Sequence, residues 1–441
     1  MNDKTIRILM TAAVAVFLAT ADARAASAAP SVTLLGRGAK NVQTKTLVAG
    51  RVAEPRKTLR VESAMGHLTV IAWDKNEVSA EAIVEAGDTD TAFLKKFLDE
   101  TTLTLEPTAG GLVLRLATPL DRGDRRVGRS LSFAARLAVR VPAAQSLETA
   151  NSFGNLTVTG ITGRLDLRNE SGKVRIEGCG GELSLENSFD EVRVADFKGP
   201  VEIRNESGAV RLERIGGKAE IRNSFGEVRF ERIGGPLTVT AESSPVTGSG
   251  VAGDCRVTSS FAAIDVRGVE GALEVGGESA AVTVADVKKD ASLRSSFEAI
   301  EARRVGGRLT VAAESAGVLA EDIGGPSDIR TSFGDVVLRR AAGPITVAGE
   351  SAGIEIEDVK CPPAGCLIDV RTSFRPIEVV LPAGAEVRGT AQAAFGRVLT
   401  DLPVTLLQSR ELETQAVSFG EGAGGVTLQL RTNGDITVRK K

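Results

Sequence analysis

The sequence is poor in the aromatic and titratable side chains on which many binding sites and catalytic sites depend. Its 441 residues include no tyrosine, one tryptophan and one histidine, and aromatic residues make up 4% of the chain. Sugars and nucleic-acid bases are commonly held by stacking on aromatic rings, and general acid–base catalysis most often uses histidine. The composition therefore argues against an enzyme and against a partner recognised by stacking.

The chain also lacks an excess of one charge. Its 54 lysines and arginines are nearly balanced by 57 aspartates and glutamates, so the net charge is −3. Proteins that bind nucleic acids or anionic membrane surfaces usually carry a strong positive excess. We therefore expect no nucleic-acid partner, and no motif in the sequence indicates a cofactor.

Residues 1–25 have the pattern of an export signal. Lys4 and Arg7 precede an apolar run at 8–21, and small residues follow it. The run is shorter than the ~20 residues that a membrane-spanning helix needs. We expect cleavage near Ala25, with an uncleaved signal anchor as the alternative, and no transmembrane segment afterwards. The mature protein would then lie in a bacterial periplasm, at the cell surface or outside the cell.

An 18-residue repeat dominates the rest of the chain. Eleven blocks from Asn151 to Ala348 align without an insertion, and columns 6, 8, 11, 15 and 17 of each block are mostly apolar. Columns 6 and 8 flank a mostly polar column, as do 15 and 17, which is typical of strands with one buried face. Column 6 holds Leu156, Val174, Val192, Val210, Val228, Val246, Ile264, Val282, Ile300, Val318 and Val336.

Glycine fills column 13 in ten of the eleven blocks, which suits a tight turn with positive φ. Each block is thus predicted to form a strand, a turn, a second strand and a second turn. Stacked blocks would bury a continuous core, so we predict an all-β fold, a β-solenoid of right-handed β-helix type. Left-handed hexapeptide helices also use 18 residues per coil, but these columns do not follow a six-residue spacing. Calcium-binding β-rolls need GGxGxD turns, which are absent, so no metal site is predicted.

A second rhythm of 36 residues is superimposed on the first. Column 3 alternates between phenylalanine and serine, as in Phe153, Ser171 and Phe189, while column 2 alternates between serine and glutamate. If a coil had 36 residues, the glutamates would stack at ~4.8 Å, whereas 18-residue coils separate them to ~9.6 Å. We therefore predict 18-residue coils in which each phenylalanine folds inward onto a small serine. The glutamates would form a solvated edge, with a cation-binding ladder as the alternative.

The predicted domains are the signal at 1–25, a β-rich capping region at 26–146 and the solenoid at 147–441, with irregular C-terminal rungs. Within the capping region, residues 91–100 predict a helix with Asp90 as N-cap and Phe93, Leu94, Phe97 and Leu98 on one face. The segment MGHLTVIAW (65–73) is similar to GNLTVTG (154–160), which indicates that early rungs occur in this region.

Two motifs are explained by the repeat. GESAG at 349–353 matches the nucleophile elbow of serine esterases, which would make Ser351 a nucleophile. The sister segments GESAA and AESAG occupy the same columns, and the single histidine, His67, lies far upstream. GSGVAG at 248–253 matches a dinucleotide-binding pattern, but a predicted strand follows it instead of a helix. We predict no catalytic residue, and keep a hydrolase using Ser351 as a distant alternative.

Two further groups of residues are candidates for structural or binding roles. Cys361 and Cys366 bracket an insertion in one rung, and we predict that they form a disulfide in an oxidising compartment. Cys179 and Cys255 fall in apolar columns and are predicted to be core residues. Four arginines crowd one loop and could contact an anionic ligand, although a solvated loop is the simpler interpretation: Arg122, Arg125, Arg126 and Arg129.

The repeated S-x-G-x-[VI]-x-[VI] rungs, the segment LPAGAEV (381–387) and the closing TNGDITV (432–438) resemble the bacterial putative-adhesin family. The resemblance covers about residues 59–441 and implies a secreted or envelope β-solenoid of undefined function. It transfers no catalytic residue. We therefore expect a non-enzymatic, adhesin-like scaffold that presents a repetitive β-surface to an envelope polymer or a protein. The alternative is a periplasmic sensor or regulatory binding module in an envelope-stress pathway.

Overall fold

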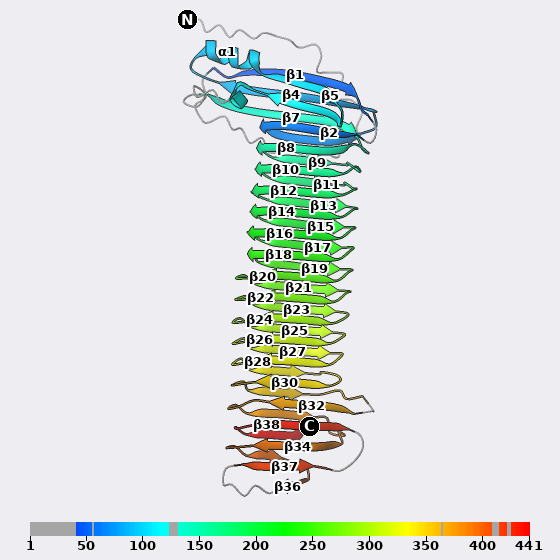
Figure 1. Ribbon diagram of the computed structural model, residues 1–441, viewed down its shortest axis with the longest axis vertical. Coiled ribbons are helices and arrows are strands. Elements are labelled where there is room, and N and C mark those ends of the chain that lie inside the picture. The colour runs from blue at the N-terminus through cyan, green and yellow to red at the C-terminus, as the bar shows by residue number, and fades with distance from the viewer. Residues whose placement is uncertain (1–40, 55–56, 123–130, 363–364, 408–413, 421–424) are drawn as a thin grey trace, which may run out of the picture.

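A computed structural model describes residues 41–54, 57–122, 131–362, 365–407, 414–420 and 425–441. The predicted signal at 1–25 lies outside the described residues. The described chain is nearly all β and forms a long column of stacked rungs with a wider N-terminal end (Figure 1). The predicted β-solenoid is confirmed.

Each rung contributes one strand to each of two facing sheets, named sheet A and sheet B below. Sheet A contains β1 (Gln43–Val52), β3 (His67–Trp73), β4 (Glu77–Gly87), β7 (Ser132–Pro142), β9 (Leu156–Thr159), β11 (Val174–Glu177), β13 (Val192–Phe197), β15 (Val210–Ile215), β17 (Val228–Ile233), β19 (Val246–Val251), β21 (Ile264–Val269), β23 (Val282–Val287), β25 (Ile300–Val305), β27 (Val318–Ile323), β29 (Val336–Arg339), β31 (Ile354–Glu357), β33 (Ile377–Leu381), β35 (Val398–Thr400) and β39 (Ile436–Lys440).

Sheet B contains β2 (Thr58–Met65), β5 (Thr102–Thr108), β6 (Gly111–Ala117), β8 (Ser146–Phe153), β10 (Leu165–Ser171), β12 (Leu183–Phe189), β14 (Val201–Ser207), β16 (Ala219–Phe225), β18 (Leu237–Ser243), β20 (Cys255–Ser259), β22 (Leu273–Gly277), β24 (Ala291–Ser295), β26 (Leu309–Ala313), β28 (Ser327–Thr331), β30 (Ile345–Gly349), β32 (Cys366–Arg371), β34 (Val387–Ala393), β36 (Val404–Leu407), β37 (Gln415–Phe419) and β38 (Val426–Thr432).

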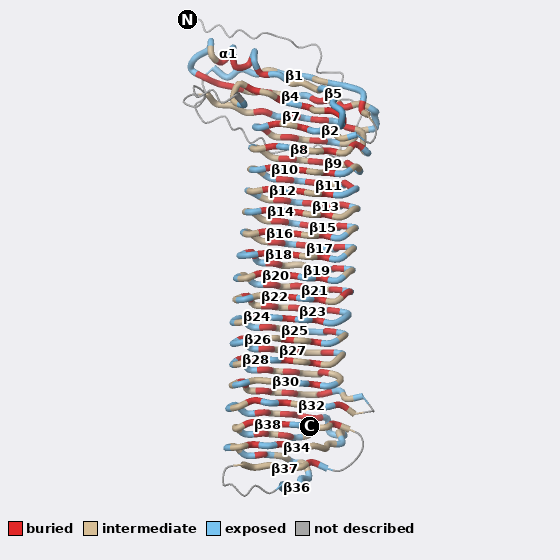
Figure 2. The backbone as a smooth tube through the Cα atoms, viewed as in Figure 1, coloured by how far each residue is buried: buried red, intermediate tan, exposed pale blue. Residues whose placement is uncertain are grey.

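The register between rungs confirms the 18-residue coil. Strand β10 pairs in parallel with β12, so that Leu165 lies beside Leu183, and β11 pairs with β13 in the same offset. Residues of the apolar columns point between the sheets and are buried, while the outward columns are exposed, which Figure 2 shows as alternating red and paler segments. Stacking therefore buries a core that no single rung could form.

The glycines of column 13 serve close packing, and the prediction of positive φ there is wrong for most rungs. At Gly217, an added Cβ would lie 2.6 Å from the carbonyl carbon of Gly199 on the neighbouring rung. Positive φ occurs instead at column 10, where Gly178 has φ 64° and Arg214 has φ 56°. The left-handed turn at column 10 thus tolerates side chains, while column 13 favours glycine because two backbones touch there in most rungs.

The N-terminal end contains an early rung, as the similarity of MGHLTVIAW to GNLTVTG indicates. Strands β2 and β3 pair in parallel with β8 and β9, and on their other side they pair with β6 and β7. Antiparallel strands β4, β1 and β5 extend the sheets beyond this rung. They replace open parallel edges, which are prone to pair with other chains.

The predicted helix is α1 (Thr91–Glu100), which lies at this N-terminal end. The Asp90 side chain accepts hydrogen bonds from the backbone N–H groups of Ala92 and Phe93, as an N-cap should. Leu94, Phe97 and Leu98 are buried, and the Phe97 ring meets the ring of Phe133 edge to face at a centroid distance of 5.6 Å. The helix therefore packs its apolar side on the end of the solenoid.

At the C-terminal end the order of rungs differs from the order of the sequence. Strand β38 lies between β32 and β34, and β39 lies between β33 and β35. The last strand pair of the chain is thus an internal rung. Strand β37 pairs antiparallel with β34, and β36 pairs antiparallel with β37, so antiparallel strands extend sheet B at this end too.

Candidate functional site

A row of phenylalanines lies exposed along one corner of the solenoid, where each rung turns from sheet B to sheet A. Their side chains are 51–71% exposed. We name this row the phenylalanine edge: Phe153, Phe189, Phe225, Phe261, Phe297, Phe333, Phe374 and Phe395. The prediction that these rings fold inward onto serine is therefore wrong. The rings project into solvent, and the row holds eight of the chain's 15 phenylalanines.

The rings recur on every second rung. Ser171 pairs with Phe153 on one side and with Phe189 on the other, so one serine corner separates successive rings. Two strand spacings of ~4.8 Å place neighbouring rings ~9.6 Å apart. The same alternation continues along the column through Phe333.

The ring spacing stays constant at the C-terminal end, although the separation of the phenylalanines in the sequence changes there. Phe374 and Phe395 are only 21 residues apart in the sequence, which would place them on adjacent rungs if the chain wound in order. The inserted rung separates them, because the N–H of Asn433 donates to the carbonyl of Ser373 and the N–H of Phe395 donates to the carbonyl of Asn433. The two rings therefore stand two rungs apart, like all the others.

A buried ladder of asparagines fixes the corner beneath the first rings. The Nδ2 of each asparagine donates to the Oδ1 of the asparagine on the next rung, at distances of 2.7–3.0 Å. The same amide groups also donate to backbone carbonyls of the turn, such as that of Gly172. The ladder consists of Asn151, Asn169, Asn187, Asn205 and Asn223. Its hydrogen bonds fix the turns of Phe153, Phe189 and Phe225, which orients these three rings alike.

Polar groups flank the rings at regular positions. A half-buried serine precedes each of the rings from Phe153 to Phe374, and an exposed glutamate stands at the adjacent position on the intervening rungs. These glutamates are Glu170, Glu206, Glu242, Glu278, Glu314 and Glu350. On the outer face of sheet B, Ser188, Glu206, Ser224 and Glu242 line a shallow hollow of about 620 Å³. The edge thus combines apolar rings with hydroxyl and carboxylate groups at a fixed period.

The opposite corner carries paired charges. At column 10, Arg304 donates to both carboxylate oxygens of Asp286 at 2.6 and 2.9 Å, and Arg340 does the same to Asp322. The hydrogen bonds from these guanidinium groups lower the pKa of each aspartate. The corner therefore satisfies its own charges, and its ion pairs are exposed enough to contribute little stability each.

The outer face of sheet A is also internally paired. Arg175, Arg193 and Arg211 stack on successive strands, and each forms a salt bridge with a glutamate at 2.8–3.1 Å. An arginine row of this kind could attract an anion, but its neighbouring carboxylates offset the charge. The phenylalanine edge is the more distinctive surface, because exposed rings have no such internal partner.

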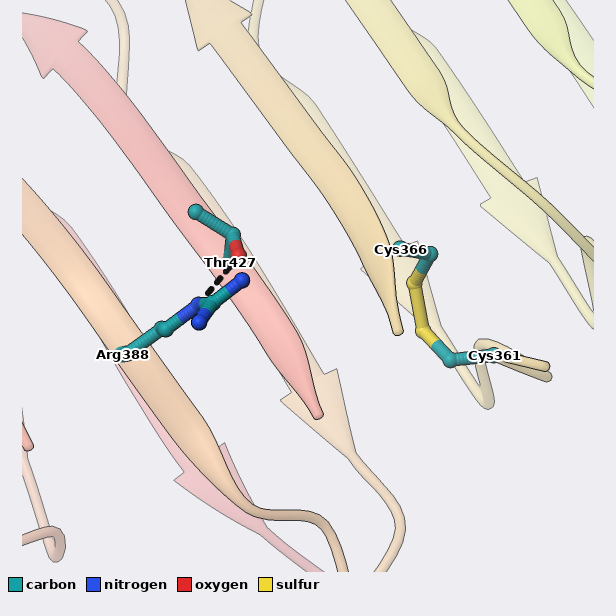
Figure 3. Close-up of a disulfide and its surroundings, with 4 residues drawn as sticks. All are labelled: Cys361, Cys366, Arg388 and Thr427. Carbon is teal, nitrogen blue, oxygen red and sulfur yellow. Dashed lines mark hydrogen bonds between the residues drawn. A yellow bond between two sulfur atoms is a disulfide. The ribbon is translucent and has the colours of Figure 1, made fainter. Parts of the chain in front are cut away.

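The predicted disulfide links the rung insertion to sheet B. In the structure, the sulfurs of Cys361 and Cys366 are bonded, and their Cα atoms are 5.3 Å apart (Figure 3). Nearby, the Arg388 Nε donates to the Thr427 Oγ1 at 2.8 Å and connects β34 to β38. Cys179 and Cys255 are free and buried, as their apolar columns predict. Burial raises the pKa of the Cys255 thiol to about 12.

The remaining sequence candidates do not come together. Arg122 ends the short 3-10 helix η1 (Pro119–Arg122), whereas Arg125, Arg126 and Arg129 lie outside the described residues. The Ser351 N–H donates to the carbonyl of Ser332 on the preceding rung, and the equivalent Ser279 and Ser315 donate in the same way to Ser260 and Ser296. His67 lies in β3, twelve strand spacings or ~58 Å from the rung of Ser351.

The described residues contain neither a metal-binding cluster nor a membrane-spanning helix. No group of three or more potential metal ligands occurs among them. Within the same residues, no helix has the length and apolar character that a bilayer crossing requires.

Comparisons with known proteins identify no family. No family model matches the chain, and no curated protein matches it. Among solved structures, a putative cell adhesion protein from Clostridium sporogenes is similar over 90% of this chain and 100% of its own, at 8% identity and a TM-score of 0.18. That score is too low to relate the two folds, so the family resemblance of the repeats remains a prediction.

Proposed function

We propose that this protein is a non-enzymatic scaffold of the bacterial cell envelope or surface, with an adhesin-like role. It would present its repetitive β-surface to an extended polymer or to a protein. The phenylalanine edge is the observation that carries this proposal, because exposed apolar rings at a constant period are typical of an interaction surface.

A periodic surface suits a periodic or extended partner. Each ring offers a similar small contact, and many such contacts along one rigid axis add through effective concentration. The exposed fraction of about half or more of each ring leaves most of its area available to a partner. The asparagine ladder supports the same conclusion, since it orients the first three rings alike.

The repetition also argues against catalysis. An active site brings a few different groups together in a concave pocket. Here the serine of the esterase-like motif has equivalents on other rungs, and the single histidine is ~58 Å away by strand spacing. We expect no hydrolysis of short acyl esters, and Ser351→Ala should leave the biological activity unchanged. Ester turnover that disappears in this variant would contradict the proposal.

The proposal is tested by retention on envelope material. Purified mature protein is mixed with the insoluble envelope fraction of the producing bacterium, and the bound share is measured by sedimentation. Deletion of 36 residues at a time should weaken retention gradually, because each deletion removes two rungs and one ring. A complete loss after one such deletion would indicate a single discrete site, and no retention of the full-length protein would refute the proposal.

A further inference from the structure

We infer that the phenylalanine edge binds an extended β-1,4-linked glycan, neutral or amino-substituted, with one disaccharide to each ring. The inference rests on the proposed function and specifies the partner. It also corrects the conclusion drawn from composition, since few aromatic residues are sufficient for a stacking surface when eight of them share one edge.

The spacing of the rings is the first support. Neighbouring rings are ~9.6 Å apart, which is close to the length of one disaccharide in an extended β-1,4-linked chain of hexoses. Successive sugars in such a chain are rotated by half a turn, so the same sugar face returns once per disaccharide. The period of the rings is constant as far as Phe395, because the inserted C-terminal rung preserves it there.

The chemistry of the edge is the second support. The C–H face of a pyranose ring is apolar and stacks on an aromatic ring, while its equatorial hydroxyls point sideways and need hydrogen-bond partners. Ser188 and Ser224 directly precede two of the rings, and Glu206 stands on the rung between them. These groups line the hollow on the outer face of sheet B, which no ring lines, and the serines are next to the rings in the sequence. They can therefore donate to and accept from the hydroxyls on the side of the sugar that faces sheet B when the sugar is stacked on Phe189 or Phe225.

Charge and shape argue against other occupants. A second copy of this chain docked edge to edge would oppose two rows of glutamates. A polyanionic glycan would meet the same carboxylates, because Arg204 and Arg222, which also line the hollow, already form salt bridges with Glu186, Glu202 and Glu220. A polyproline II peptide has a turn of ~9.3 Å, but such peptides dock in aromatic-lined grooves. Here each ring stands on a convex corner, which suits a flat sugar face.

Binding is measured by isothermal titration calorimetry of the full-length mature protein with cellohexaose and chitohexaose, and with maltohexaose as the α-linked control. We expect the two β-linked hexasaccharides to bind, with more than one per protein chain, and maltohexaose to bind at least several-fold more weakly. Replacing all eight phenylalanines of the edge by serine should abolish binding, because each stacked ring contributes roughly two- to ten-fold in affinity.

Serine is the residue that the intervening rungs already carry at this corner, so these substitutions are compatible with the fold. The matched control replaces Arg193, Arg211 and Arg229, which are exposed on the outer face of sheet A, by serine. Both proteins are checked for unchanged far-ultraviolet circular dichroism. Retained binding by the eight-fold variant, or equal losses in the two proteins, would overturn the inference.

Two deletions separate the period of the edge from its length. Deleting 261–296 removes two rungs and leaves Phe225 and Phe297 two rungs apart. Deleting 261–278 removes one rung and leaves the same two rings three rungs apart. Each deletion removes only Phe261 from the edge. In affinity electrophoresis with soluble hydroxyethyl cellulose and glycol chitin, the one-rung deletion should be retarded less than the two-rung deletion, although it is the longer protein.

The physical reason is that the one-rung deletion shifts the rings from Phe297 onward by half a disaccharide relative to the rings before them. At that distance along the glycan, the sugar presents its opposite face. Equal retardation of the two deletions would contradict a periodic ligand. Sedimentation velocity provides a further check, since a dimer that the eight serines dissociate would assign the edge to self-association. Phenylalanine-dependent binding of a proline-rich peptide without any glycan binding would assign it to a protein.

The outcome for the glycan is separable from the proposed function. If the protein is retained on envelope material but binds neither β-linked hexasaccharide, this inference fails and the proposed function stands. If it is not retained and binds no hexasaccharide, both fail.

Discussion

The asparagine ladder makes a quantitative prediction about stability. Asn205 is buried in the middle of the ladder. Its Oδ1 accepts from Asn187, and its Nδ2 donates to Asn223 and to the carbonyl of Gly208, at 2.8–3.1 Å. Asn151 stands at the end of the ladder, and its Oδ1 has no hydrogen-bond partner among the described residues. Truncating Asn205 therefore takes a hydrogen bond from more groups than truncating Asn151 does.

We expect Asn205→Ala to destabilise the protein by about 2–4 kcal/mol. The change leaves the Oδ1 of Asn223 without its donor and one carbonyl of the turn without its amide, and each buried unsatisfied group costs ~1–3 kcal/mol. Asn187 loses its acceptor but still donates to backbone carbonyls. Asn151→Ala likewise leaves the Oδ1 of Asn169 and the carbonyl of Gly154 without their donor, but it breaks no hydrogen bond from a preceding asparagine and removes an Oδ1 that is buried and unpartnered in the native protein. Its cost should therefore be smaller than that of Asn205→Ala by roughly 1–3 kcal/mol.

Urea denaturation followed by circular dichroism measures the two variants, and amide hydrogen exchange locates the effect. Exchange should accelerate in β12, β14 and β16 of Asn205→Ala before it accelerates in distant rungs, because each rung contacts mainly its neighbours. Equal destabilisation by the two substitutions, or uniform exchange along the solenoid, would refute the role assigned to the ladder.

Three further predictions concern the core, the cysteines and the charged corner. Val228→Asp would bury an unpaired carboxylate and lower the free energy of unfolding by several kcal/mol. Residue 229 faces outward on the same strand, so Arg229→Asp should change the melting temperature much less. Equal melting temperatures of the two variants would refute the column assignment. Intact-mass analysis after alkylation should show that Cys361 and Cys366 do not react without reductant. Cys179 and Cys255 should react only after unfolding, because burial raises the pKa of both thiols. Labelling of all four cysteines in the native, unreduced protein would contradict this prediction. Arg304→Gln should destabilise the protein slightly at pH 7 and not at all below the folded-state pKa of Asp286. The reason is that a carboxyl whose pKa is lowered on folding contributes its stability above the unfolded-state pKa and loses it as the pH falls through the folded-state pKa. Parallel urea titrations measure the difference, and a difference that persists in acid would exclude the ion pair as its cause.

Most of the fold could be predicted because its information is local and repeated. The apolar columns recur at fixed offsets, so strands, turns and coil length follow from period-two alternation and stacking. The helix at 91–100 was equally accessible, since Asp90 and the spacing of its apolar residues are local signals. The asparagine ladder had a sequence signal too, in the asparagine that opens five successive blocks.

The phenylalanine edge was missed for a physical reason. Alternation along the strand predicts that column 3 points inward like column 1, where Asn169 is buried. The strand geometry is not regular as far as column 3. Asn169 pairs with Asn187 and Ser171 pairs with Phe189, but Glu170 and Ser188 between them do not pair. The turn that follows begins at Gly172, which has φ 130°. Side-chain direction at such a corner depends on backbone geometry that the apolar pattern does not encode. The insertion of β38 between β32 and β34 could not be predicted for a different reason. The local sequence pattern predicts strands and turns, but it does not predict the order in which rungs stack.

That insertion places the end of the chain inside the solenoid, and this has a consequence for the timing of folding. A chain emerging from its N-terminus can stack rungs in order as far as β32 and β33. Strands β34 and β35 then have no parallel neighbour until β38 and β39 arrive, although β34 can already pair with antiparallel β37. Docking of β34 and β35 onto the rest of the solenoid can therefore occur only after β38 and β39 have been synthesised. A truncated chain that lacks β38 and β39 would leave Phe395 without the rung that spaces it, so only molecules that contain these two strands carry the complete edge.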